Sequence, residues 1–431
     1  MSLPFGNPDT TFESFLQELP ADYAELAREF KAFARSRKIK TPAQLLQVVM
    51  SYCGLDAALR DVAGQFTLLE ERLTDTAIHQ RLKACGPWIK ALLGRLMGEA
   101  AQPLLAGHLR FILIDGSTVQ GPGATGTQYR LHLALDLVRL EWSYSLVTDE
   151  HTGEQLSHDP LQDGDVAIVD RGYNPVEQWM AMADRGVALV IRYNPHGVKL
   201  YTAEGTPVDL EAVLREPTAT DRCLPVPVRH QGQAFLNGYL HARCLPPAQA
   251  AEARRRARAA AKKAGRQIQA RTLALAGWVL LWTTLPPAVL PTDTVMGLYR
   301  LRWQVELAIK RLKSILNIDQ LRARKNSALA DLYLHGKLLY AWVIEKRLRR
   351  RCGRDWNRLD QPRRATPWRL VKLVRRELTE AIQAASQWQW SRWSAALQVM
   401  QERPRRRTLQ TVPERIRHLI ADCQARGVSN I

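Results

Sequence analysis

The sequence predicts an α/β protein whose mixed sheet, with helices on its faces, lies between helical N-terminal and C-terminal regions. Short apolar runs with strand-like spacing begin near Leu109, whereas the preceding residues have helical periodicity. From Asp293 the pattern is again helical almost to the end of the chain. The 431 residues are enough for two or three domains, and 46% hydrophobic and 24% charged residues are ordinary proportions for a globular protein.

The N-terminal residues have the signals of amphipathic helices. Thr41 followed by Pro42 is typical of an N-cap and a first-turn proline. A second helix is expected over residues 82–97. Apolar residues follow the first signal at helical spacing: Leu45, Leu46, Val49 and Met50.

Two predicted strands each end in an aspartate. The apolar residues 111–114 precede Asp115, and the apolar residues 166–169 precede Asp170. Both runs have the length and composition of buried strands. We therefore expect two carboxylates at the C-terminal ends of two strands of the same sheet.

Further strands complete the predicted sheet. Strict alternation over residues 129–137 and 140–146 predicts a hairpin of two half-buried strands. A helix over residues 179–184 and a strand over residues 188–191 follow the second aspartate.

A β-rich insertion is expected after these strands. Residues 196–245 place glycines and prolines among short strand-like runs, and residues 248–269 read as an exposed basic helix. Residues 273–282 are expected to return to the sheet as an apolar strand. The uncharged stretch 272–292 is long enough to span a bilayer, but Pro286-Pro287 favours a strand and a proline turn.

The net charge of +19 is concentrated at one end of the chain. Residues 301–431 contain 29 Lys and Arg against 11 Asp and Glu. Such a one-sided basic excess is typical of proteins that bind a polyanion. The alternative is a solubility bias in an arginine-rich proteome.

Several classes of protein are excluded or disfavoured. The six cysteines are scattered without zinc-ligand spacing, as in a cytosolic protein with reduced thiols. No signal peptide is recognisable at the N-terminus. The glycine-rich residues 121–126 lack the Gly-Lys-Ser/Thr ending of a P-loop, so no nucleotide cofactor is expected.

One predicted helix after Asp293 carries a stripe of functional side chains. Tyr299, Glu306 and Lys313 are seven residues apart, and Arg302 lies one turn before Glu306. A salt-bridged surface face is the alternative, because Arg302–Glu306 and Glu306–Lys310 are ordinary i,i+4 pairs.

Asp115, Asp170 and Glu306 together form a set of three carboxylates. Gathering them is unfavourable unless cations neutralise their charge. Mg²⁺ or Mn²⁺ does this with oxygen ligands, and two such ions about 4 Å apart catalyse phosphodiester cleavage.

These motifs resemble the DDE transposases of bacterial insertion sequences. The resemblance rests on Asp115-Gly-Ser, on Asp170-Arg171-Gly172-Tyr173 and on the spaced tetrad Tyr299, Arg302, Glu306 and Lys313. The tetrad is similar to the YREK signature of the subgroup called the IS four family. The resemblance covers residues 109–345 and implies a ribonuclease-H-like core with a β-rich insertion before the glutamate.

The resemblance also implies roles for single residues. Asp115, Asp170 and Glu306 would be catalytic ligands of two Mg²⁺ or Mn²⁺ ions. The residues that would contact DNA are Tyr299, Arg302, Lys313, Lys310, Arg171 and Tyr173. Family members cleave through a DNA hairpin and stack a flipped base on an aromatic residue. Trp278 is preferred to Trp282 for that stacking, and Trp303 is expected to pack internally.

The helical ends of the chain and the resemblance of the central part together predict three domains and a set of partners. Residues 1–105 would be a helical DNA-binding or docking domain, and residues 106–345 the catalytic domain with its insertion and basic helix at about 196–272. Residues 346–431 would be a basic helical region for DNA contacts and dimerisation. The partners would be the terminal inverted repeats and target DNA, bound by a homodimer in the bacterial cytoplasm, at the nucleoid, with no membrane contact.

Two rival functions remain open. One is a ribonuclease-H-like nuclease without strand transfer. The other is a non-catalytic repressor derived from a transposase. Near the predicted site, His132 and Asp136 are expected to have structural roles, and Asp163, Asp165 and Glu177 to be solvated charges.

The charge distribution generates a first testable prediction. The affinity for duplex DNA should fall steeply with salt, because each neutralised phosphate adds about −0.9 to the slope of log K against log salt. Filter binding at several salt concentrations would measure this slope. A flat response would contradict the role of the basic surface.

Overall fold

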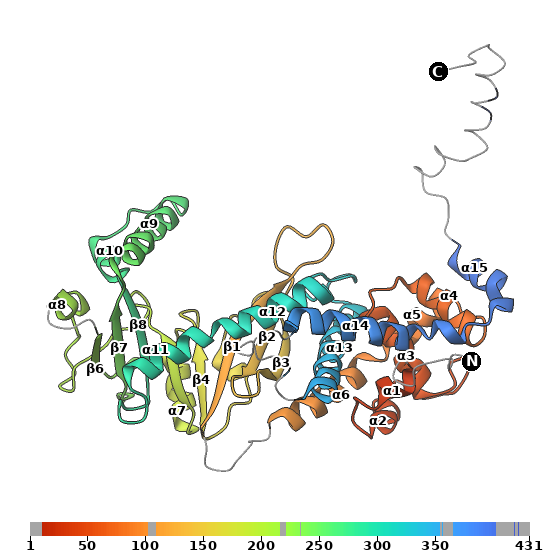
Figure 1. Ribbon diagram of the computed structural model, residues 1–431, viewed down its shortest axis with the longest axis horizontal. Coiled ribbons are helices and arrows are strands. Elements are labelled where there is room, and N and C mark those ends of the chain that lie inside the picture. Colours follow the sequence, from red (N-terminus) through yellow and green to blue (C-terminus); the bar gives the residue numbers. More distant parts are fainter. Residues whose placement is uncertain are drawn as a thin grey trace.

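The computed structural model describes residues 11–101, 109–215, 221–232, 234–353, 356, 365–401, 418 and 421. The molecule is elongated. In Figure 1 a helical lobe lies at one end, the central sheet lies in the middle, and the insertion lies at the other end.

The N-terminal helices have the predicted local signals. The side chain of Thr41 accepts a hydrogen bond from Gln44 N at 3.1 Å and so caps the helix that begins at Pro42. This part of the chain contains α1 (Phe12–Leu16), α2 (Tyr23–Glu29), α3 (Pro42–Cys53), α4 (Leu59–Leu69), α5 (Asp75–Lys83) and α6 (Gly86–Ala101).

The first five strands form the predicted mixed sheet. The hairpin of β2 and β3 adds to β1 in antiparallel fashion, and β4 and β5 follow in parallel. The elements are β1 (Arg110–Val119), β2 (Tyr129–Asp136), β3 (Glu141–Asp149), the 3₁₀ helix η2 (Leu156–His158), β4 (Asp165–Val169), α7 (Val176–Asp184) and β5 (Ala188–Arg192).

The insertion extends this sheet. Strand β8 pairs antiparallel with β5, and β7 and β6 continue outward, so the eight-stranded order is β3-β2-β1-β4-β5-β8-β7-β6. The elements are α8 (Leu210–Arg215), β6 (Asp221–Pro225), β7 (Tyr239–Cys244), α9 (Pro247–Lys263), α10 (Ala270–Leu275) and β8 (Trp278–Thr283).

The strand expected over residues 273–282 is wrong in its first part. Residues up to Leu275 belong to α10, and the strand begins at Trp278 after a turn at Gly277. A short apolar run is compatible with a helix or a strand. Here Leu275 is the one buried residue of the short helix α10.

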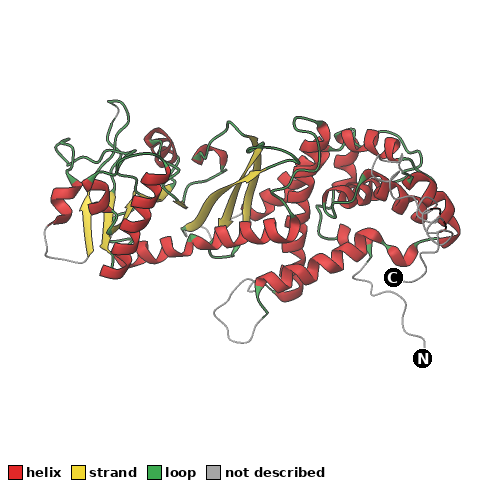
Figure 2. Ribbon diagram, turned by 90° about the horizontal axis from the view of Figure 1, so that it is seen from above, coloured by secondary structure: helices red, strands yellow, loops and turns green. Residues whose placement is uncertain are grey.

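The remaining helices cover the sheet and return to the helical lobe. Their bounds are α11 (Thr292–Leu301), α12 (Trp303–Leu316), α13 (Ala328–Cys352), α14 (Pro367–Gln383), the 3₁₀ helices η3 (Ala385–Gln387) and η4 (Trp390–Arg392), and α15 (Trp393–Met400). Helices α6, α12 and α13 contact one side of the first three strands, and α7 covers the other face at β5. Figure 2 shows α11 and α12 along the length of the molecule.

The C-terminal helices do not form a separate body. Gln47 Nε2 on α3 donates to Ile382 O on α14 at 2.8 Å, and Gln389 N donates to Leu68 O on α4 at 2.9 Å. One hydrophobic cluster runs from Phe12 to Val399. The proposed domain boundary after residue 345 falls inside the continuous helix α13.

A buried ion network joins these helices. Arg347 on α13 has a fully buried side chain, and its Nε lies 2.6 Å from Glu18 Oε1. Its Nη1 pairs with Glu377 on α14, and its Nη2 donates to Ser14 O on α1 at 2.6 Å. One cation therefore ties three helices together.

None of the helices in the described ranges combines the length and the apolar character needed to cross a membrane. The five cysteines in those ranges are free thiols: Cys53, Cys85, Cys223, Cys244 and Cys352.

The Arg347 network generates a stability prediction. Arg347→Ala should lower the free energy of unfolding by about 3–5 kcal/mol, because it removes the fully buried cation shared by Glu18 and Glu377 and leaves them only the more exposed Arg350 and Arg351. Urea denaturation would measure this loss. Arg376→Ala is the control, since Arg376 is exposed and lies 3.7 Å from Glu380 on one helix surface. Equal effects of the two substitutions would contradict the role of the network.

Candidate active site

The alternation of β1 and β4 directs two aspartates to one face of the sheet. Leu113 belongs to the core beneath α12, and Asp115 lies two residues further along β1 on the same face. Ile168 and Asp170 have the same relationship at the end of β4. Because Leu113 pairs with Ile168 in parallel register, the two aspartates are adjacent across the strands.

Asp115 is not at the end of its strand, contrary to the prediction. β1 continues to Val119, paired with Tyr129 of β2, beyond the point where its parallel partner β4 stops. Pairing with β2 on the other edge of β1 keeps residues 115–119 in the strand, while the edge toward β4 stays open there. Asp115 therefore lies beyond the end of β4, where β1 has no neighbouring strand on that side in the described ranges, although β1 itself continues to Val119.

The predicted stripe spans two helices rather than one. Arg302 separates α11 from α12, with hydrogen bonds of the i,i+3 type on either side: Arg302 N to Tyr299 O at 3.1 Å and Val305 N to Arg302 O at 3.2 Å. Its backbone stays in the right-handed helical region. The side chains of the stripe therefore remain on one side.

Arg302 connects the carboxylates. Its Nη2 pairs with Glu306 Oε1, and its Nη1 lies 3.9 Å from Asp115 Oδ2. The guanidinium carbon also lies 5.6 Å from the centre of the Tyr299 ring. Its Nε is buried without a hydrogen-bond partner in the part of the chain that the structure describes.

Asp170 is held by the other members of the site. Tyr299 OH donates to its Oδ1 at 2.9 Å, and Arg192 Nη1 lies 4.0 Å from the same atom. Burial raises the pKa of Asp170, but the Arg171 N–H, Tyr299 and the guanidinium groups of Arg302 and Arg192 outweigh burial and hold that pKa below its ordinary value.

Asp115 has the opposite balance. Burial raises its pKa to about 6, against the opposing effects of the Gly116 N–H and Arg302. The charges of Glu306 and Glu154 raise this pKa further.

Two lysines of α12 are free to meet a ligand. Lys310 is exposed and Lys313 is partly exposed, and neither side chain has an ion-pair partner among the described residues. They follow Glu306 at four and seven residues, so they continue its helix face. Of the two i,i+4 pairs in the alternative of a salt-bridged face, Arg302–Glu306 is present, and no Glu306–Lys310 pair occurs among the described residues.

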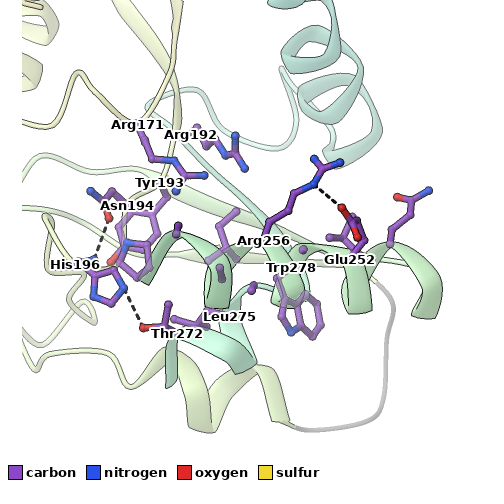
Figure 3. Close-up of a pocket in the computed structure, with 18 of the residues that line it drawn as sticks. Arg171, Arg192, Tyr193, Asn194, His196, Glu252, Arg256, Thr272, Leu275 and Trp278 are labelled. Atoms are coloured by element: carbon purple, nitrogen blue, oxygen red, sulfur yellow. Dashed lines mark hydrogen bonds and ion pairs between the residues drawn. The ribbon is translucent and has the colours of Figure 1, made fainter. Parts of the chain in front are cut away.

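A cleft with a volume of about 800 Å³ is lined by Arg171, which follows Asp170, and by Arg192, whose Nη1 lies 4.0 Å from Asp170 Oδ1. Arg171 and Arg192 line it from the side of β4 and β5, and Arg256 and Trp278 line it from the insertion (Figure 3). Trp282 does not reach it: that side chain is fully buried, stacks on Trp179 at 5.0 Å and donates to Val226 O.

Two predicted aromatic roles do not agree with the structure. Tyr173 was expected to contact DNA, but it is only 1% exposed and packs in the core against which α7 lies. Trp303 was expected to pack internally, but it is 57% exposed beside Arg302. The sequence around Tyr173 and Trp303 has no periodicity that would predict which of the two is buried and which is exposed.

Neighbouring polar residues have mostly the expected structural roles. His132 is buried and its Nε2 lies 2.8 Å from Thr148 Oγ1, and Asp136 accepts hydrogen bonds from the N–H groups of Val138 and Arg139. Asp165 is a correction, because it is buried and paired with Arg110 at 2.7 Å rather than solvated.

The basic residues divide into internal and exposed groups. Helix α9 is exposed along nearly its whole length, as predicted, with Ala250 as its one buried residue among those described. Arg347, Arg349, Arg350 and Arg351 are engaged with glutamates. Two further arginine clusters of the basic C-terminal region, the pair Arg363-Arg364 and the triplet Arg405-Arg406-Arg407, lie outside the described residues.

Comparison with known proteins identifies the family. The family described as "Transposase DDE domain" matches residues 106–342. The transposase for insertion sequence element IS421 of Escherichia coli is 31% identical over 335 residues, which cover 76% of this chain and 90% of that protein. The transposase for IS231C of Bacillus thuringiensis subsp. berliner is 26% identical over 202 residues, or 43% of this chain and 42% of that protein.

The chain is a DDE transposase. The predicted subgroup, the IS four family of insertion-sequence transposases, is confirmed. The central sheet, with β1 flanked by an antiparallel hairpin and two parallel strands, is the ribonuclease-H-like core of that domain. The β-rich insertion enters between β5 and α11.

A DDE transposase domain implies the use of divalent metal ions. The donor set of the transposase fits such ions, because Asp115, Asp170 and Glu306 supply only carboxylate oxygens. As the side chains stand, no group of three or more such ligands in the described ranges is close enough to hold an ion. Arg302 lies between two of the carboxylates and acts as their counter-ion.

Two members of the site were missed from the sequence. Arg192 is the last residue of β5. Because β5 is parallel to β4, Arg192 lies at the same edge of the sheet as Asp170. The apolar run 188–191 could therefore have predicted a polar residue near Asp170 at this position. Glu154 lies in the loop after β3 and approaches Gly116 and Gly172. Nothing in the sequence around Glu154 marks it.

The counter-ion role of Arg302 generates a prediction. In EDTA, Arg302→Ala should lower the free energy of unfolding by about 1–2 kcal/mol, because Asp115 and Glu306 lose their shared cation. Mg²⁺ should stabilise this variant more than the wild type. Thermal melts with and without Mg²⁺ would measure both effects.

Arg300→Ala is the matched control, because Arg300 is exposed on α11 and has no ion-pair partner among the described residues. An identical Mg²⁺ response in Arg302→Ala and wild type would contradict the counter-ion role.

Proposed function

We propose that this transposase binds the inverted terminal repeats of its insertion sequence, cleaves the DNA through hairpin ends and joins the resulting 3′-hydroxyls to target DNA. The observation that carries the proposal is the site itself. Asp115 and Asp170 lie on adjacent strands, and Arg302 links Asp115 to Glu306 of α12, near a cleft lined by cations and a tryptophan.

Asp115, Asp170 and Glu306 would hold two Mg²⁺ or Mn²⁺ ions. Such ions activate the attacking hydroxyl and stabilise the leaving oxygen of a phosphodiester. The hydrogen bond from Tyr299 orients Asp170 and favours its ionised form. This hydrogen bond is present without a bound ion.

The cations around the carboxylates would hold the strand that is cut. Lys310 and Lys313 lack ion-pair partners among the described residues, and Arg171 lies beside Asp170 on the wall of the cleft. Arg302 has a buried Nε without a partner in the same ranges, which a phosphate oxygen would satisfy. These contacts position the DNA backbone without reading its sequence.

The cleft would accept a nucleotide that is extruded from the duplex. Its volume of about 800 Å³ suits a ligand of that size. Trp278 would stack on the base, while Arg171, Arg192 and Arg256 balance the phosphate charge. The exposed Trp303 offers a second aromatic surface beside Arg302.

The synaptic complex would be at least a dimer, because two element ends must be paired. The exposed basic helix α9 would extend the DNA contact beyond the active site. The reaction would need no nucleotide cofactor and would take place on DNA in the bacterial cytoplasm.

The rival functions are distinguishable from this one. A nuclease without strand transfer would cut the terminal repeats but leave target DNA unjoined. A repressor would bind the repeats without cutting. The intact set Asp115, Asp170, Glu306 and Arg302 at one edge favours catalysis over the repressor.

The central test is a cleavage assay on a labelled duplex that carries the ends flanking the gene. Asp115→Asn, Asp170→Asn and Glu306→Gln should each lower metal-dependent cleavage by a factor of about 100 or more, since each removes a carboxylate charge from the transition-state cations. Binding to the same duplex should be retained. A nick followed by a product of hairpin length would support the proposed route.

Asp163→Asn is the control, because Asp163 is an exposed carboxylate in the loop before β4. Equal losses of binding and cleavage in the three variants would show that these carboxylates have a structural role.

A further inference from the structure

Glu154 places a fourth carboxylate at the catalytic edge of the sheet. Its Oε1 lies 3.0 Å from the position that a Cβ on Gly116 would occupy, and its Oε2 lies 2.4 Å from the corresponding position on Gly172. Gly116 directly follows Asp115, and Gly172 is two residues after Asp170. The Glu154 carboxylate therefore lies beside the backbone that follows each of the two aspartates.

The two glycines are explained by this side chain rather than by their backbones. Neither Gly116 nor Gly172 has a positive φ, so any L-residue could adopt their conformations. The nearest atoms that a Cβ at either position would meet belong to Glu154. The Asp115-Gly-Ser and Asp170-Arg-Gly-Tyr motifs thus each contain a glycine where the Glu154 carboxylate packs against the backbone.

The loop that carries Glu154 is fixed on both sides. Before it, Asp149 Oδ1 accepts from Thr152 N at 2.8 Å, and His158 Nε2 lies 3.3 Å from Gly153 O. After it, Leu156 N donates to Gln178 Oε1 at 2.8 Å. The position of Glu154 is therefore set by its neighbours and not by a charge partner.

Glu154 has no hydrogen bond or ion pair of its side chain within the described ranges. Its charge acts on Asp115, whose pKa is about 6, and on the buried Tyr173, whose pKa it also raises. A carboxylate held in such a place is unfavourable unless a cation compensates it. Arg302 is already shared between Asp115 and Glu306.

We propose that Glu154 is a fourth acidic residue of the divalent-cation site, acting beside Asp115 to strengthen the binding of the ion. This inference rests on the proposed function of Asp115, Asp170 and Glu306 as cation ligands. Glu154 is a positioning residue: its charge lies beside Gly116 and Gly172 and acts on the ion through the field at Asp115, without a hydrogen bond to that ligand.

The test measures Mn²⁺ binding to the full-length protein without DNA, by titration followed with electron paramagnetic resonance. Glu154→Gln keeps the shape of the side chain and removes its charge. It should weaken Mn²⁺ binding roughly tenfold or more. Circular dichroism in EDTA should be unchanged.

Two reference variants make the outcome specific. Glu177→Gln removes an exposed charge from the first turn of α7 and should bind Mn²⁺ like the wild type. Asp170→Asn removes a proposed ligand and should bind it weakly. If Asp170→Asn is weak but Glu154→Gln matches the wild type, the Glu154 proposal alone fails. If all three match the wild type, the proposed cation site fails as well.

Gly172→Ala gives a second and independent test. The new Cβ would meet Glu154 Oε2 at 2.4 Å and displace the carboxylate, which is the movable end of a flexible side chain. This variant should therefore reproduce the weaker Mn²⁺ binding of Glu154→Gln. The double variant should bind no more weakly than Glu154→Gln, because both changes act through one group. Independent, multiplicative losses would overturn the proposed link between Gly172 and Glu154.

Discussion

The repulsion among carboxylates at one sheet edge is the constraint around which this transposase is organised. Asp115 and Asp170 are brought together by the parallel register of β1 and β4, and Glu306 is added from α12. Each addition raises the electrostatic cost of the folded state. The protein offsets that cost with Arg302 and Arg192, and with hydrogen bonds from Tyr299 and the N–H groups of Gly116 and Arg171.

This arrangement explains why the two aspartates differ. Asp170 is surrounded by donors and cations, which hold its pKa below the ordinary value. Asp115 is more strongly affected by burial and by neighbouring carboxylates, which raise its pKa to about 6. The two aspartates therefore have different electrostatic environments although they lie on adjacent strands. An entering cation would have most effect on the less compensated of the two.

The strands and the three carboxylates were predictable because they depend on local patterns. Apolar runs at 111–114 and 166–169 place each aspartate, and the alternation at 129–137 marks the hairpin. The features that could not be predicted depend on tertiary neighbours. The extension of β1 to Val119 requires β2, the burial of Tyr173 requires the core around α7, and Glu154 is placed by a loop without periodicity. The C-terminal helices likewise show their amphipathic pattern but not the surface on which they pack.

The helical lobe is built from both ends of the chain, and this has a consequence for the order of events during synthesis. Helices α1 and α3 emerge from the ribosome first, but the side chains that bury their apolar faces belong to α13 and α14. The hydrogen bonds from Arg347 to Glu18 and from Gln47 to the carbonyl of Ile382 can form only after those later residues have been synthesised. Closing such long loops is slow, and the first helices stay incompletely packed until the last quarter of the chain is made. The lobe at one end of the molecule is thus completed after the central sheet, so that a chain cut short after α12 would leave α1 and α3 without the surfaces of α13 and α14 on which they pack.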